Sequence, residues 1–269
     1  MSETESKLNL EELQREELKI LIGFREICRK YGLSYFITAG TLLGAIRHKG
    51  FIPWDDDVDV VMPRKDYDKL AKLMRKAPRS EFFYQDGKTD KLYPFGFAKL
   101  RSNGCLVYES VLENVQINNG CYIDIFPLDR CPNGDGTARL FFKLYLFFTT
   151  ALIKKVNPRY EVGYGKKAVL AAQKAASRLP RGVINALRET VRRCAFGKRL
   201  CTVGGAHGYP RETYLREWFE SEVSVEFEGE KFSAPSGWDN LLTNMYGDYM
   251  TPPAENERGG HFAEIKKEN

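Results

Sequence analysis

Residues 54–60 read WDDDVDV, which places four carboxylates within five positions of a segment that is otherwise apolar. The alternation of acid and valine predicts a strand. Alternate residues of a strand share a face, so Asp57 and Asp59 are expected to project together while Val58 and Val60 enter the core. Two such close carboxylates repel each other unless a cation lies between them, and oxygen ligands suit Mg²⁺ or Mn²⁺. The alternative is a solvated acidic turn before an ordinary strand.

The preceding segment, residues 35–48, reads YFITAGTLLGAIRH and predicts a short strand, a glycine turn and a short helix. Exposed amides and the helix dipole at Gly40 and Thr41 favour a phosphate oxygen, and the Thr41 hydroxyl adds a further donor. Arg47 and Lys49 supply cations nearby. We therefore expect this segment to bind phosphate.

A third carboxylate, Asp124, lies within YIDIF at residues 122–126, again with aliphatic neighbours on either side. On a strand its side chain would face away from those neighbours and could complete a metal site. It could equally be an Asp near a strand end that bonds to backbone amides. The residues alone leave both interpretations open.

The rest of the chain predicts an α+β fold, a mixed sheet flanked by helices, with an additional helical insertion. Helices are expected at residues 10–31, 64–76 and 236–246, the last capped by the Ser236 hydroxyl, and strands at 57–62, 81–85, 95–101, 105–109 and 121–126. A hairpin is expected around Glu228 and Gly229. We divide the chain into a catalytic core at 1–136, a basic helical insertion at 137–205, and a segment at 206–269 that completes the catalytic domain.

Composition narrows the class of protein. The chain of 269 residues is 43% hydrophobic and has no run of eighteen uncharged apolar residues. Its polar start does not have the pattern of a signal peptide, which predicts a cytoplasmic protein, and six scattered cysteines predict reduced thiols. Residues 140–153 are apolar and precede a basic stretch, so they form either a buried helix or a contact with a membrane surface. No nucleic-acid motif accompanies the basic stretch, and no nucleic-acid partner is expected.

Residues 35–48 and 50–60, together with 123–129 and 246–250, closely resemble the LicD family, which is related to fukutin and fukutin-related protein. The resemblance implies a nucleotidyltransferase-like fold whose glycine turn, paired acids and third acid correspond here to Gly40-Thr41, Asp57 with Asp59, and Asp124. It implies that these three acids are catalytic and hold Mg²⁺, or Mn²⁺. Asp248 and His261 fall in the matching C-terminal block and join the expected donor-binding residues.

The same resemblance implies an activity. Characterised bacterial members transfer phosphocholine from CDP-choline to sugars of teichoic acid or lipopolysaccharide. We therefore expect transfer of phosphocholine, or a similar substituted phosphate, from a CDP-linked donor to a glycan, either free or lipid-linked at the inner face of the membrane. The alternatives are a nucleotidyltransferase that uses an NTP and an inactive glycan-binding protein.

Overall fold

The computed structural model describes residues 9–77, 81–160, 167–258 and 264–266 of the chain. Its main sheet runs in the order β1-β2-β5-β4-β10, with β3 paired to β4, β6 to β5 and β7 to β6. Their bounds are β1 Phe36–Ile37, β2 Asp59–Pro63, β3 Phe83–Gln85, β4 Ala98–Tyr108, β5 Gly120–Cys131, β6 Arg199–Cys201, β7 Thr213–Tyr214 and β10 Glu264–Lys266. The pair β2–β5 is parallel and its neighbours are antiparallel, so the sheet is mixed and the predicted α+β class is confirmed.

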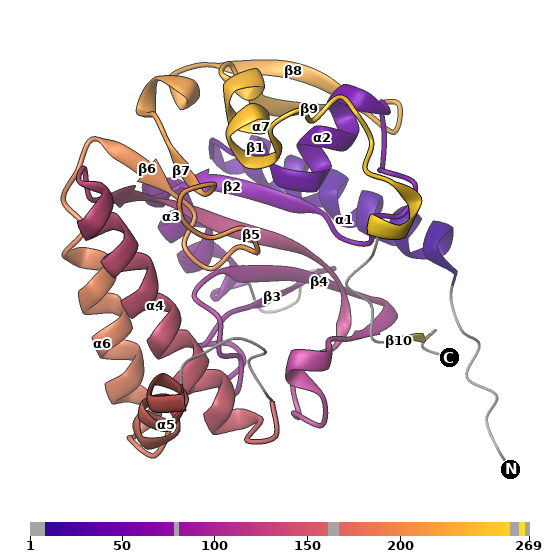
Figure 1. Ribbon diagram of the computed structural model, residues 1–269. Helices are drawn as coiled ribbons and strands as arrows, with labels where there is room; N and C mark the ends of the chain where they lie inside the picture. Colours follow the sequence, from indigo (N-terminus) through magenta and orange to yellow (C-terminus); the bar gives the residue numbers. More distant parts are fainter. Residues whose placement is uncertain (1–8, 78–80, 161–166, 259–263, 267–269) are drawn as a thin grey trace, which may run out of the picture.

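Two helices cover one face of this sheet. α1 (Leu10–Tyr31) packs against β4 and β5, and α3 (Arg64–Met74) packs against β2 and β5 (Figure 1). α1 has the predicted bounds: Asn9 and Glu12 form a capping box at its start, and Gly32 adopts the left-handed conformation at its end. The apolar face of α1 is buried in the main core.

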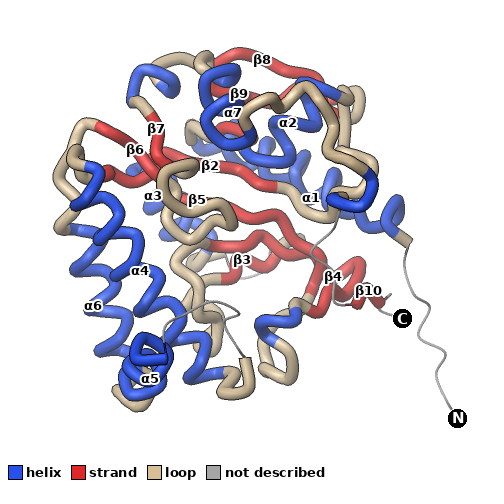
Figure 2. Tube along the Cα trace, viewed as in Figure 1, coloured by secondary structure: helices blue, strands red, loops and turns tan. Residues whose placement is uncertain are grey.

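A second group of elements packs above β1 and β2, as Figure 2 also shows. It comprises α2 (Ala39–Arg47), α7 (Trp238–Tyr246) and the hairpin of β8 (Glu222–Phe227) and β9 (Glu230–Pro235). α2 contacts α7, β2 and β8. Glu228 and Gly229 both have positive φ at the hairpin turn, which confirms the predicted turn.

The helical region lies beside the sheet and consists of α4 (Asp135–Val156), α5 (Lys167–Ala176) and α6 (Arg181–Arg193). α4 packs along both α5 and α6 and has a small core of its own. Short 3₁₀ helices occur at η1 (Ser110–Leu112), η2 (Arg216–Phe219) and η3 (Glu255–Glu257). Strand β6 lies within the predicted insertion yet joins the main sheet, and the domain boundaries at 136 and 205 stay predictions.

Several local predictions are wrong. β2 begins at Asp59, so Asp57 precedes the strand, and β4 is one strand with a bulge rather than two. α7 has Gly237 at its N-cap and no side-chain cap bond, in place of the predicted Ser236 cap. Cys105 and Cys121 form a disulfide between β4 and β5, against the prediction of reduced thiols. Periodicity within one segment does not report a partner that lies on another strand.

The apolar helix in the middle of the chain is also longer than predicted. α4 has 22 residues, so by length and composition alone it could cross a membrane. One face of α4 is buried, however, with Phe142 and Tyr145 each only 2% exposed. A partly buried core helix passes the same test of length and composition.

Candidate active site

The central feature of the site is a row of charged residues across three strands. The register pairs Asp59 of β2 with Asp124 of β5, and Asp124 in turn with Lys99 of β4. Residues in register on neighbouring strands project to the same face, so these three side chains meet on one side of the sheet. The Lys99 ammonium donates to Oδ1 of Asp124 at 2.7 Å.

Lys99 was not among the predicted site residues. Its side chain is buried, with only 1% of the residue exposed. Its Nζ also lies 3.2 Å from Oε1 of Glu109, and Oε2 of Glu109 accepts from Arg101 at 2.9 Å. Because both basic residues pair with Glu109, its pKa lies below the usual range even though burial acts to raise it. Lys99 therefore bridges Asp124 and Glu109, and this network holds the Asp124 carboxylate in position.

The acids of this row carry charge that the protein compensates only in part. Burial raises the pKa of Asp59 well above its usual value, and repulsion from Asp57 and Asp124 raises it further. Burial also raises the pKa of Asp124 to about 6, against the opposing effect of Lys99. Glu17 of α1 lies beneath the same cluster, and its pKa is raised by burial and then by Asp57.

This donor set fits a hard divalent cation. Carboxylate oxygens of Asp55, Asp56 and Asp57 lie within 4.8 Å of one another. Among the described residues, this is the one group of three or more acidic, histidine or cysteine side chains whose ligand atoms come that close together. Asp57 and Asp59 both line the adjoining cavity, and their negative charges raise each other's energy unless a cation is shared. The consecutive acids at 55–57 extend the predicted set of Asp57, Asp59 and Asp124.

The start of α2 lies at the rim of the same cavity, and Gly40 lines it. A Cβ at position 40 would lie 2.5 Å from Oδ2 of Asp55, so glycine permits this close approach. Thr41 is buried, and its hydroxyl accepts a hydrogen bond from the Asp59 amide at 2.8 Å. Thr41 therefore ties α2 to β2 and does not line the cavity.

Of the remaining predicted donor-binding residues, some line the cavity and others do not. Arg47 and Asp248 line the cavity, and Nη1 of Arg47 donates to the Tyr249 carbonyl at 2.7 Å. Lys49 is exposed, lies outside the cavity lining and pairs through its backbone with the β8–β9 turn. His261 lies outside the described residues.

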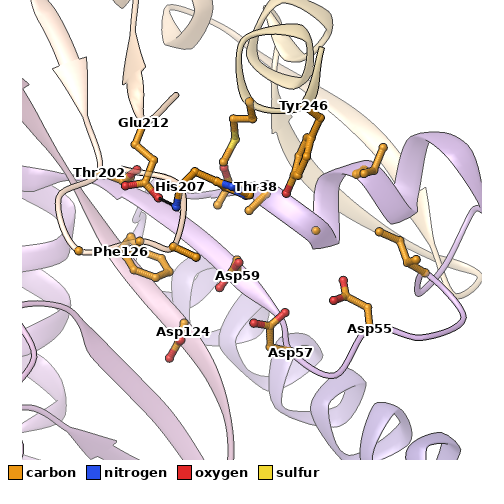
Figure 3. Close-up of a pocket in the computed structure, with 18 of the residues that line it drawn as sticks. Thr38, Asp55, Asp57, Asp59, Asp124, Phe126, Thr202, His207, Glu212 and Tyr246 are labelled. Carbon is orange, nitrogen blue, oxygen red and sulfur yellow. Dashed lines mark hydrogen bonds between the residues drawn. The ribbon is translucent and has the colours of Figure 1, made fainter. Parts of the chain in front are cut away.

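The cavity that joins these groups has a volume of about 830 Å³. Its lining includes the aromatic residues Phe95, Phe97, Tyr122 and Phe126, together with residues of α7 and of the segment between β6 and β7. Figure 3 shows Asp57, Asp59 and Asp124 beneath Tyr246, with His207 and Glu212 at the opposite end from Asp55. Strand and helix periodicity carries no signal for His207 and Glu212, and the sequence indicated Tyr246 only as part of the segment 246–250 that resembles the LicD family.

Comparisons with known proteins identify the family of the chain. Residues 32–137 match the family model described as LicD/FKTN/FKRP, nucleotidyltransferase domain. The chain is 30% identical to the lipopolysaccharide cholinephosphotransferase LicD of Haemophilus influenzae over 96% of this chain and 98% of that protein. It is 37% identical to the ribitol 5-phosphate transferase FKRP of Homo sapiens over 22% of this chain and 11% of that protein. The resemblance predicted from the motifs is confirmed, and the chain belongs to the LicD family.

Proposed function

We propose that the protein transfers a substituted phosphate, phosphocholine in the first instance, from a CDP-linked donor to a hydroxyl of a cell-surface glycan. One observation carries the proposal: the acid row of Asp59 and Asp124, with Asp57 beside it, opens on the same cavity as the N-terminus of α2. Metal-holding acids and a phosphate-binding helix start are the two elements that phosphoryl transfer requires. The similarity to a cholinephosphotransferase over nearly the whole chain supports the choice of group.

Asp57, Asp59 and Asp124 would hold Mg²⁺, or Mn²⁺, which when bound neutralises charge on the donor diphosphate. The amides at the start of α2 and the Arg47 guanidinium orient the phosphate oxygens. The glycan hydroxyl attacks the phosphorus that bears choline, and the bond from that phosphorus to the bridging oxygen breaks, so that CMP leaves. Asp59 or Asp124 accepts the hydroxyl proton.

The aromatic wall supports a quaternary ammonium as the transferred head group. Trp54 and Tyr122 line the cavity, but cations already lie over both rings: the Arg258 guanidinium at 4.5 Å and the Lys99 ammonium at 3.4 Å. The rings of Phe95 and Phe97 stack at 5.2 Å, and Phe97 lies 4.4 Å from Phe126. The Lys99 ammonium lies 5.6 Å from the Phe97 ring centroid as well, so we place the choline against Phe95 and Phe126, because aromatic faces attract such cations.

A lipid-linked acceptor would bring the protein to the inner face of the cytoplasmic membrane. α4 exposes Leu140 and Leu144 beside the basic Lys143, while its opposite face packs in the core. Apolar and basic side chains together favour contact with an anionic bilayer surface. This peripheral contact is part of the proposal.

The test is release of CMP from CDP-choline in the presence of Mg²⁺, with and without candidate glycans. Asp57→Asn and Asp59→Asn should abolish it, whereas the exposed Asp68→Asn should not. If only CDP-ribitol or CDP-glycerol is turned over, the proposed reaction type stands, but the transferred group is ribitol phosphate or glycerol phosphate instead of phosphocholine. Release of pyrophosphate from an NTP with no turnover of any CDP-linked donor would replace the proposal with nucleotidyl transfer.

A further inference from the structure

A second carboxyl group opens on the cavity from the segment between β6 and β7. Glu212 is only 2% exposed and lines the cavity at the end away from Asp55. Its Oε1 accepts from the His207 amide at 3.2 Å, as the dashed line in Figure 3 marks. Its Oε2 is buried and has no hydrogen-bond partner within the described ranges. A buried acceptor without a partner is costly, so this oxygen is expected to bind a ligand.

The segment is built to hold this carboxyl in place. The Glu212 amide donates to the Gly208 carbonyl at 2.9 Å, and its carbonyl accepts from the Thr202 amide at 3.2 Å. A Cβ at position 205 would lie 2.0 Å from Oε1 of Glu212, so only glycine lets the chain close over the carboxyl. The conformation therefore fixes the position of Oε2.

The surroundings of Glu212 are polar. Among the described residues no Lys or Arg forms an ion pair with it, and its neighbours are His207, Cys201 of β6, Tyr214 of β7 and Tyr246 of α7. Burial raises the pKa of Glu212 to about 7, against the opposing effect of the His207 and Gly208 amides. A carboxyl that exchanges its proton near neutral pH can both accept from a hydroxyl and donate to one.

The chemistry of this end differs from that of the metal-binding acids. A phosphate would be repelled by the Glu212 carboxylate, and among the described residues the group of three or more side chains placed to share a metal is Asp55, Asp56 and Asp57, not one that includes Glu212. The hydroxyl groups of a sugar match a single carboxyl flanked by tyrosines, because each hydroxyl is both donor and acceptor. Thr202, whose hydroxyl is hydrogen-bonded to that of Tyr214 at 2.9 Å, lines the same end of the cavity.

We propose that Glu212 forms the floor of a sugar-binding subsite and that its Oε2 hydrogen-bonds to a hydroxyl of a sugar ring. The subsite rests on the proposed function, since it presumes that the cavity receives substrate. Two substrates carry such a ring: the ribose of the donor nucleotide and the acceptor sugar. Figure 3 shows Tyr246 between Glu212 and Asp55, and burial followed by the charges of the neighbouring acids, Asp59 and Glu212 among them, raises the pKa of Tyr246.

The experiment compares wild type with Glu212→Gln, which keeps an acceptor for the His207 amide but cannot ionise. The exposed Glu217→Gln is the matched control. Binding of CMP and of 2′,3′-dideoxy-CMP is measured by calorimetry, and binding of a panel of methyl hexosides by saturation-transfer NMR, at pH 8. Loss of one charge-assisted hydrogen bond should weaken the relevant ligand about tenfold in Glu212→Gln and leave Glu217→Gln unchanged.

Weaker binding of CMP but not of dideoxy-CMP assigns the subsite to the ribose; weaker binding of a hexoside alone assigns it to the acceptor. Unchanged binding of every ligand would overturn the subsite. None of these readings needs turnover, so they stand apart from the outcome of the transfer assay. Should Glu212→Gln fail to fold, Gly205→Ala displaces the carboxyl without removing it and should weaken the same ligand.

Discussion

The two ends of the cavity hold carboxylates in opposite ways. At one end Asp55, Asp57, Asp59 and Asp124 are crowded together, and the buried Lys99 compensates part of their charge. At the other end Oε1 of Glu212 accepts from the His207 amide, and within the described ranges no Lys or Arg forms an ion pair with this carboxyl. Crowded acids suit the divalent cation that we propose for this end, whereas a single buried acid suits the neutral hydroxyl that we propose for the other. The difference is the basis for proposing that phosphate transfer occurs at the first end and sugar binding at the second.

The largest expected effect is loss of transfer on removal of a crowded carboxylate. Asp59→Asn should lower kcat by about 10³-fold, because the proposed metal ligand and its charge are lost together. The same variant should be more stable than wild type in EDTA, since burial and repulsion penalise the Asp59 charge in the folded state. Steady-state kinetics and thermal unfolding measure the two effects, and retained activity would contradict the assignment.

The next effect concerns Lys99, the buried basic residue that pairs with Asp124. Lys99→Met should destabilise the fold by about 3–5 kcal/mol, because it leaves the buried Asp124 without its basic partner and leaves Glu109 with Arg101 alone. Denaturant unfolding measures this, with the exposed Lys91→Met as control. Adding Asp124→Asn should recover part of the loss, as expected for contacting residues in a double-mutant cycle. Simple additivity of the two substitutions would show that the pair is not coupled.

Glu212 should give the protein a pH-dependent stability. Its folded pKa of about 7 lies above the ordinary value of 4.5, so the folded state binds more protons than the unfolded state between these pH values. The contribution of Glu212 is therefore fully present below pH 4.5 and is lost as pH rises through 7. Relative to wild type, Glu212→Gln should gain roughly 2–3 kcal/mol over this range. A difference that stays constant from pH 4.5 to 8 would argue against the raised pKa.

The smallest effect distinguishes Arg47 from Lys49, which the sequence predicted to bind phosphate together. Arg47→Ala should raise the KM for the donor about tenfold, because Arg47 lines the cavity and would lose a charged contact with phosphate. Lys49→Ala should change that KM by less than about twofold, because Lys49 is exposed and outside the cavity. Equal effects of the two substitutions would remove Arg47 from the donor site.

Local patterns predicted much of the fold and part of the site. The bounds of α1 follow from its caps, and the acid and valine pattern at 57–60 indicated which side chains face the cavity. Lys99 was beyond such reasoning, since its partner Asp124 is set by the register of β4 on β5. Thr41 shows the same limit, because its hydroxyl bonds to a strand amide that only the folded chain brings near.

Glu212 was harder still to find. It lies in an irregular segment between two short strands, and neither β6 nor β7 was predicted. Its position depends on backbone bonds from Gly208 and on the space left by Gly205, neither of which follows from hydrophobic periodicity. Sites on such segments come from tertiary structure rather than from a local pattern.

The most direct measurement follows phosphorus by ³¹P NMR while the protein acts on CDP-choline and a glycan with Mg²⁺. We expect the diphosphate signals to disappear, CMP to form, and a phosphodiester signal to appear on the glycan, none of which should occur with Asp59→Asn. Persistence of the diphosphate with every CDP-linked donor, together with pyrophosphate formation from an NTP, would contradict transfer of a substituted phosphate at this site.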